Sequence, residues 1–340
     1  RLHGAVPDRA RAPLRGALLN RVVSRSFPEH PDLGQEVEPR IYLGQMLTPD
    51  SLPAFATAAV AGSVVGLEIP FADPRRTPRF IEPRADVLHF SAGGSGSADS
   101  AGAFSWNVSG GVLNVIFPDG MSAEYRRLGA FDGLAQLVLT RLLLTEQANN
   151  QSLLIAGLSV PVQPNVALQE SEIPGQYFEF GRGSETYLGG IFDFRYVLRA
   201  DGSGSEHVLV NHSFDITGRS YLSGSPHLET TPIRWLARDN QTLDIQYTSD
   251  QQTGEPGCDP GQSSECSIDR LASERLLARN GNRFYVIETV FFGDSEALFY
   301  SVVRFYDRGP VPTPTAKTAS TSSRSMLGAK HRAPAGLDAQ

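Results

Sequence analysis

The sequence predicts a mainly β protein with two tandem antiparallel β-barrel or meander domains, a short N-terminal amphipathic helix and a disordered or extended C-terminal tail. Three observations support this prediction. The chain contains an internal repeat around its only two Trp residues, it has short alternating apolar segments between Gly-rich turns, and its 340 residues include 33 Gly. A chain of this length forms one large or two ordinary domains. It contains no uninterrupted strongly apolar run long enough to span a membrane as a helix.

The basic N-terminal segment, residues 1–35, precedes the first β domain. Leu14, Leu18 and Val22 lie four residues apart, which predicts an amphipathic helix from Pro13 to Arg25. The helix is either a targeting or surface-lying element, or one that packs its apolar stripe on the body or on a neighbouring subunit. Because the chain begins with Arg, we expect it to be a processed or excised piece of a longer product.

The first β domain, residues 36–164, contains one copy of the repeat. FSAGGSGSA at 90–98 matches LRADGSGSE at 198–206, and a Trp follows each copy, Trp106 and Trp235. Each Trp is followed by an alternating apolar trio, which is typical of a half-buried strand. The trios are Leu113, Val115 and Phe117 in the first copy and Leu243, Ile245 and Tyr247 in the second.

The second β domain, residues 165–308, is richer in aromatic residues and has two insertions relative to the first, 207–233 and 251–266. Loops that lengthen without adding core are where partner contacts concentrate, so these insertions are candidate functional surface. The segment that follows, residues 309–340, is rich in Pro, Ser, Thr and Ala. It has too few bulky apolar side chains to offset its ordering entropy, which predicts the extended or disordered tail.

The strand order of the second copy resembles that of a known family. It opens with Gly175 and Tyr177, continues with an aromatic strand that ends in the turn at 201–204, and then gives the Trp235 strand and a strand of x-L-x-I-x-Y pattern. This resembles the lipocalin-like up-and-down β-barrel domains of bacterial secreted and envelope proteins. Tyr177 stands where the classical pattern has Trp. The resemblance implies a barrel whose interior is either filled by side chains or holds a small molecule.

Aromatic side chains on one face of the second copy are the candidate ligand-binding residues. Two interpretations stay open: these side chains line a site for an apolar or aromatic small molecule, or they form the core of the domain. An open apolar cavity of a few hundred Å³ would favour binding, and a filled interior would favour a structural role. The candidates are Phe192, Phe194, Tyr196, Trp235, Tyr247 and Phe284, together with Val286.

Both cysteines, Cys258 and Cys266, lie in the second insertion. We expect a disulfide between them, which indicates an oxidising compartment and therefore an extracellular, periplasmic or cell-surface location. Free thiols and a metal site are the alternatives. A metal site would need further ligands, and the nearest His, His227, lies about 30 residues away.

The net charge of −7 is unevenly distributed. Residues 1–30 carry +4 and residues 311–340 carry +3, which leaves −14 for the body. A nucleic-acid binder collects Lys and Arg where phosphates lie, so we expect no nucleic-acid binding by the acidic body.

Motifs of catalysis are absent from the sequence. It contains no G-x-S-x-G elbow, no H-E-x-x-H pair and no phosphate-binding loop. We therefore expect no enzyme activity, no cofactor and no metal. The sequence favours a secreted or cell-envelope structural, adhesive or assembly module that self-assembles through its oppositely charged ends and body, or contacts another envelope or extracellular component. The alternative is lipocalin-like binding of an apolar or aromatic small molecule in the second barrel.

Overall fold

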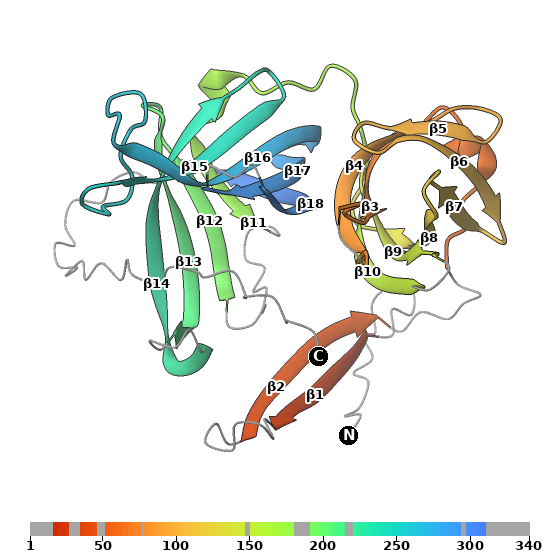
Figure 1. The fold of residues 1–340 in the computed structure, drawn as a ribbon, viewed down its shortest axis with the longest axis horizontal. Coiled ribbons are helices and arrows are strands. Elements are labelled where there is room, and N and C mark those ends of the chain that lie inside the picture. The colour runs from red at the N-terminus through yellow and green to blue at the C-terminus, as the bar shows by residue number, and fades with distance from the viewer. Residues whose placement is uncertain are drawn as a thin grey trace.

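The two predicted β domains are closed eight-stranded antiparallel barrels in tandem (Figure 1), which confirms the predicted fold class. The computed structural model describes residues 16–26, 35–45, 52–75, 78–146, 150–179, 191–214, 220–293 and 297–310. Side-chain surroundings are described for fewer of these residues, from 52 onward. The predicted C-terminal tail lies outside the described residues from position 311.

The first barrel follows a one-turn helix, α1 (Thr57–Val60). Each strand pairs with the next, and the last strand closes the barrel on the first through Val160 and Gly66. Its strands are β3 (Val64–Phe71), β4 (Glu82–Phe90), β5 (Ser95–Ala98), β6 (Gly102–Ser109), β7 (Val112–Ile116), β8 (Met121–Ala130), β9 (Gln136–Leu144) and β10 (Gln151–Pro161).

The second barrel follows a short 3₁₀ helix, η3 (Glu170–Glu172). It has the same up-and-down order, and it closes where Gln176 pairs with Gly309. Its strands are β11 (Gly175–Glu179), β12 (Ile191–Leu198), β13 (Ser203–Phe214), β14 (Ser220–Ala237), β15 (Thr242–Asp250), β16 (Cys266–Asn280), β17 (Arg283–Phe292) and β18 (Ala297–Gly309).

The sequence repeat corresponds to the same turn in both barrels. The backbone N–H of Trp106 donates to Gly94 O over 2.7 Å, and that of Trp235 donates to Gly202 O over 2.9 Å. Both glycines have positive φ, +86° and +78°, a conformation that side chains disfavour. The backbone conformation of this turn therefore explains the glycines that the two copies of the repeat share. Each indole Nε1 also donates to the backbone carbonyl just after the strand two earlier in the chain, that of Ser91 after β4 or of Arg199 after β12.

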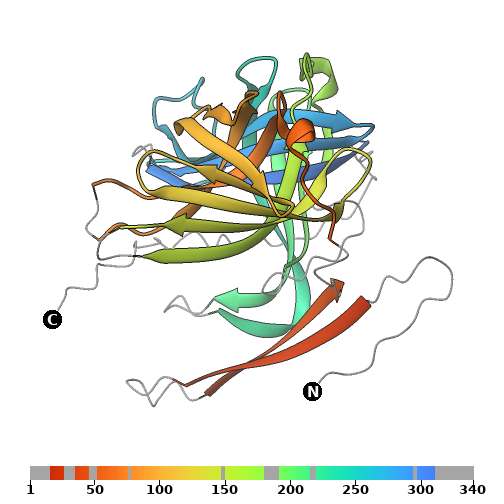
Figure 2. The same cartoon turned by 90° about the vertical axis from the view of Figure 1, so that its right-hand side faces the viewer.

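The predicted N-terminal helix is wrong over its described part. Residues 16–26 form β1 (Gly16–Ser26), which pairs antiparallel with β2 (Gln35–Gln45). A spacing of four residues, as between Leu18 and Val22, is even, so it places side chains on one face of a strand as well as of a helix. The β1–β2 pair is hydrogen-bonded to no strand of either barrel among the described residues (Figures 1 and 2).

The two insertions of the second copy extend its β structure and add a loop. β13 and β14 have 12 and 18 residues, against four and eight in their counterparts β5 and β6. The first insertion therefore lengthens a hairpin, while the second forms the loop between β15 and β16. Both change the periphery of the barrel and leave the strand order unchanged.

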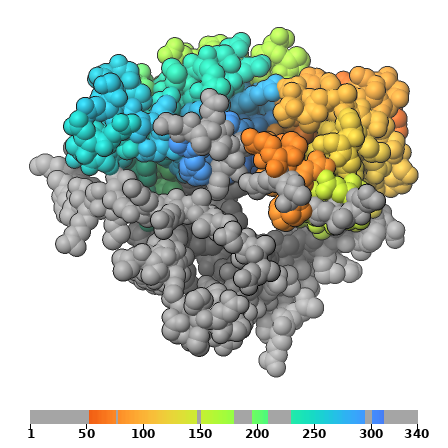
Figure 3. Space-filling view, in the orientation of Figure 1, coloured from red at the N-terminus to blue at the C-terminus, as the bar shows by residue number. Residues whose placement is uncertain are grey.

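The two barrels lie against each other (Figure 3), and an apolar core fills the contact between their outer faces. β17 accordingly buries both faces: Phe284 and Val286 lie inside its barrel, while Tyr285 and Ile287 face the first barrel. A near-continuous apolar run is typical of such a strand. The buried members of this inter-barrel core are Ala85, Val87, Ala135, Leu158, Val160, Leu277, Ala278, Tyr285, Ile287, Val303 and Phe305.

Polar contacts surround and enter the inter-barrel core. Arg275 Nη1 lies 2.6 Å from Asp99 Oδ2, and the Tyr285 hydroxyl donates to Asp132. Within the core, the N–H of Val303 donates to Glu68 Oε1 over 3.3 Å, while Glu68 Oε2 has no hydrogen-bond partner. Burial raises the pKa of Glu68 to about 7. The interface therefore contains a carboxyl group whose surroundings favour its neutral, protonated form.

Substitution Glu68→Gln tests this assignment. The folded-state pKa of Glu68 exceeds its ordinary value of 4.5, so the folded state binds the proton more tightly and loses stability as the pH rises from 4.5 toward 7. The unfolding free energy of the variant should therefore exceed that of the wild type by up to about 3 kcal/mol at pH 8, and by little at pH 4. Urea denaturation at both pH values measures the difference. Exposed Glu255→Gln is the control, and a loss of stability at pH 8 in Glu68→Gln would contradict the assignment.

Candidate functional site in the second barrel

The interior of the second barrel contains the predicted aromatic candidates whose side chains are described. Tyr196, Trp235, Tyr247 and Phe284 are buried in one inner cluster, and Val286 lies beside them. Phe192 and Phe194 lie in β12, but their side chains fall outside the described part of the structure. The barrel thus brings together four of the six predicted residues, and their role in binding stays a prediction.

A small, partly open cavity lies within this inner cluster. Its volume is about 30 Å³, which is room for roughly two to three groups of the size of a water molecule. This part of the interior is thus mostly filled, which by itself favours a structural role, and Glu274 is the one carboxylic acid in the cavity wall. The cavity is lined by Leu168, Tyr177, Tyr196, Leu198, Leu243, Ile245, Glu274, Phe284, Val286 and Tyr306.

Two glutamates form a buried pair at the cavity wall. Glu274 follows the inward-facing Ala272 by two residues on β16, and Glu288 follows the inward-facing Val286 by two on β17. The β16–β17 register places Glu274 and Glu288 directly opposite each other, with 4% and 1% of their surfaces exposed. Like charges in this arrangement repel, so the two carboxyl groups do not both ionise readily.

Tyr306 links the two carboxyl groups. Its hydroxyl oxygen lies 3.0 Å from Glu274 Oε1 and 2.9 Å from Glu288 Oε2. A hydroxyl has one hydrogen to donate, so two short contacts to carboxyl oxygens require a further proton on one of the acids. Burial, and next the charge of Glu288, raise the pKa of Glu274 well above its ordinary value. Because Arg304 pairs with Glu288, Glu274 is the member of the pair that holds the proton.

Two arginines balance the remaining carboxylates. Arg304 Nη1 lies 3.3 Å from Glu288 Oε2, and Arg270 Nη2 lies 3.2 Å from Glu206 Oε2. The Arg270 guanidinium also lies over the Tyr247 ring, 3.4 Å from its centroid. When Glu274 is protonated, the two negative charges of Glu206 and Glu288 balance the two positive charges of Arg270 and Arg304.

The first barrel has uncharged residues at the equivalent positions. Leu113 pairs with Tyr125 as Leu243 pairs with Glu274, so Tyr125 corresponds to Glu274. Thr140, opposite Tyr125, then corresponds to Glu288. By the same alignment, Ala98, Phe117 and Met121 stand where the second barrel has Glu206, Tyr247 and Arg270.

Sequence reasoning missed the charged members of this cluster. The available signal was the alternation of side chains along a strand. Each charged residue lies an even number of positions from the inward-facing apolar residues of its strand, so it faces inward as well. Pairing the charges with one another required the strand register, which the pattern alone does not specify. The missed residues are Glu206, Arg270, Glu274, Glu288 and Arg304.

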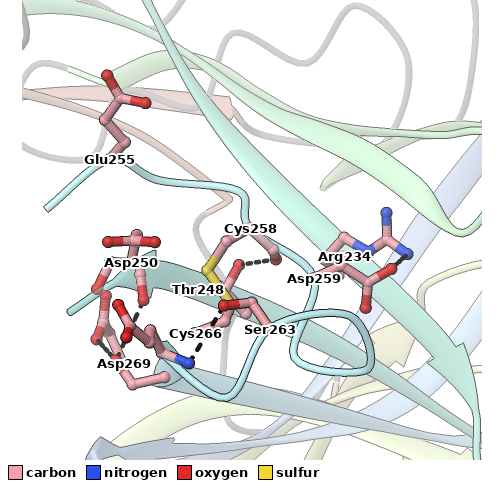
Figure 4. Close-up of a disulfide and its surroundings, with 12 residues drawn as sticks. Arg234, Thr248, Asp250, Glu255, Cys258, Asp259, Ser263, Cys266 and Asp269 are labelled. Atoms are coloured by element: carbon pink, nitrogen blue, oxygen red, sulfur yellow. Dashed lines mark hydrogen bonds and ion pairs between the residues drawn. A yellow bond between two sulfur atoms is a disulfide. The ribbon is translucent and has the colours of Figure 1, made fainter. Parts of the chain in front are cut away.

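The predicted disulfide is confirmed (Figure 4). Cys258 and Cys266 are bonded, with 5.8 Å between their Cα atoms, so neither is a free thiol. The Thr248 hydroxyl donates to Cys258 O over 2.7 Å, and Arg234 Nη2 lies 2.6 Å from Asp259 Oδ2. The inserted loop is thus attached to β14 and β15 as well as crosslinked internally.

Neither a metal centre nor a spanning helix is found in the described part of the chain. No group of three or more His, Cys, Asp or Glu side chains there is placed to hold a metal ion, and no helix there is long and apolar enough to cross a bilayer. No protein family and no curated protein matches the sequence. Kinship with lipocalin-like proteins stays a prediction, whereas the barrel architecture is confirmed.

Removal of the disulfide in a Cys258→Ala, Cys266→Ala double variant should lower the unfolding free energy by roughly 2.5 kcal/mol, because the crosslink closes a short loop in the unfolded chain. Chemical denaturation of both proteins, with and without reductant, measures this loss. Reductant should reduce the stability of the wild type alone. Equal stability of wild type and variant without reductant would contradict a stabilising role.

Proposed function

We propose that the second barrel binds a small molecule with an apolar or aromatic body, while the first barrel serves as its structural scaffold. One observation carries the proposal. Four positions that are uncharged in the first barrel, Ala98, Met121, Tyr125 and Thr140, correspond to charged or titratable residues inside the second.

Folding of such a barrel does not require charged residues at these positions. The first barrel closes around an apolar interior, in which Phe90 packs edge-on against Phe104 and Trp106. Burying ion pairs is often less favourable than packing apolar residues of the same volume. Ionisable groups with strongly shifted pKa values cluster at functional sites, and the pKa of Glu206, like that of Glu274, is raised by burial.

The surroundings of the cluster suit a binding role. Tyr196, Tyr247 and Phe284 provide aromatic walls, and the cluster adds a few convergent polar groups, which is the usual composition of a small-molecule site. The disulfide supports a secreted or cell-envelope location, because such bonds persist in oxidising compartments. We propose no catalytic role for the cluster.

Giving the second barrel the residues of the first tests the proposal. Arg270→Met alone should cost about 3 kcal/mol, because it leaves Glu206 buried without its partner. Adding Glu206→Ala should recover most of that loss. In thermal-shift measurements with neutral, cationic and anionic aromatic fragments, at least one class should stabilise the wild type and leave the double variant unchanged.

Two outcomes would contradict the binding role. If the double variant is at least as destabilised as Arg270→Met alone, the pair of Glu206 and Arg270 serves the fold. If all fragment classes shift wild type and double variant equally, or shift neither protein, the cluster is not a binding site.

A second candidate function is assembly into homo-oligomers or filaments, or attachment to another envelope component. The specific observation is the hairpin of β1 and β2, two strands of 11 residues that join neither barrel among the described residues. A lone hairpin is marginally stable in water, and its two open edges are templates for further strands. Basic ends of +4 and +3 around a −14 body add an electrostatic route to contact between copies.

Size-exclusion chromatography with light scattering tests assembly. The full chain should form species larger than a monomer at high concentration and low salt, and removal of residues 1–51 and 311–340 should leave a monomer. Raising the salt concentration should weaken assembly, because exposed charges are screened. A monomeric full chain that behaves like the truncated one would rule this function out.

A further inference from the structure

We infer that the small cavity of the second barrel binds the ammonium group of a small primary amine, with Glu274 Oε2 as its acceptor. This inference rests on the proposed binding function of the barrel and specifies the chemistry of its ligand.

The cavity wall offers one unsatisfied polar atom. Glu274 Oε2 is buried and has no hydrogen-bond partner. The other polar side chains of the wall are already engaged: Tyr177 donates to Ile173 O over 2.7 Å, Tyr196 is bonded to Tyr247, and Tyr306 to the acid pair. A buried acceptor without a donor is costly, so a ligand that supplies an N–H donor gains that free energy on binding.

Charge balance favours a cationic donor. Glu206, Glu274 and Glu288 face two guanidinium groups, those of Arg270 and Arg304. When an alkylammonium ion binds, Glu274 gives up its proton to solvent, its carboxylate forms an ion pair with the ligand, and the cluster with its ligand stays neutral. A carboxylate ligand would instead add a second negative charge beside Glu288.

The aromatic rings strengthen the preference for a cation. Tyr196, Phe284 and Tyr306 line the cavity, and the faces of such rings attract an ammonium group where water is excluded. The remaining walls, Leu198 and Ile245 among them, are aliphatic. They suit a short hydrocarbon body attached to the charged head.

Leu168 sets the length of that body. It belongs to the segment that precedes β11 and forms part of the cavity wall, while its N–H donates to Asn240 O over 2.6 Å. With about 30 Å³ available, the cavity fits an ammonium group carrying one or two carbons. A longer chain meets the Leu168 side chain.

Calorimetric titration of the full chain with methylammonium and ethylammonium, against methanol, ethanol and acetate at equal ionic strength, tests the inference. The amines should bind in the millimolar range expected of such small ligands. Repeating the titration at pH 7 in buffers of different ionisation enthalpy should show release of about one proton per amine bound, because Glu274 ionises. The alcohols should bind at least tenfold more weakly, and acetate not at all.

Two variants separate the residues responsible. Glu274→Gln, which keeps the side-chain shape, should weaken amine binding at least tenfold and abolish proton release, whereas exposed Glu255→Gln should change neither. Leu168→Ala should shift the preferred amine toward longer chains by about three carbons, because that many are removed from the wall. Unfolding curves of each variant establish that the barrel is intact.

Three results would overturn the inference: alcohols that bind as tightly as amines, full amine affinity in Glu274→Gln, or an unchanged chain-length preference in Leu168→Ala. If neutral or anionic fragments stabilise the wild type while amines do not, the ligand class is wrong and the binding function stands. If no amine, alcohol or fragment binds the wild type, both proposals fall.

Discussion

The burial of β16, β17 and β18 on both faces is the constraint on which the second barrel depends. Many of their outer side chains, Tyr285 and Val303 among them, pack against the first barrel, which keeps solvent from much of that side of the wall. Their inner side chains include Glu274, Glu288 and Tyr306. The carboxyl pair itself is buried and has little access to water, which is why burial dominates the pKa shift of Glu274.

Duplication explains how such a costly cluster is tolerated. Both barrels share the strand order, the positive-φ glycine turn and the Trp that bonds to it, so the same scaffold folds twice. In the first copy the position of Glu274 is taken by Tyr125, whose buried hydroxyl donates to Glu68 O over 2.9 Å. The stability of the first barrel and of the shared interface supports a second barrel whose interior is less favourable.

The sequence predicted the parts of the fold that local chemistry determines. The Gly-rich turns, the Trp strands and the bonded Cys258–Cys266 pair follow from backbone conformation and short spacing. The helix expected around Leu18 was wrong because a four-residue spacing suits both helix and strand, and only the pairing partner, β2, decides between them. The acid pair was missed for a related reason: Glu274 and Glu288 meet through strand register, which no local pattern encodes.

Access to the acid pair is coupled to the contact between the barrels. The inter-barrel core closes one side of the wall, and the segment before β11 roofs the cavity through Leu168. That same segment begins at the interface, where the N–H of Gln163 donates to Leu277 O over 2.9 Å and its side chain accepts from the N–H of Arg279. Displacing that segment therefore strains hydrogen bonds to β16, the strand that carries Glu274. The first barrel has an equivalent roof, in which the N–H of Phe55 donates to Gly111 O, but beneath it lies an apolar core with no acid to reach.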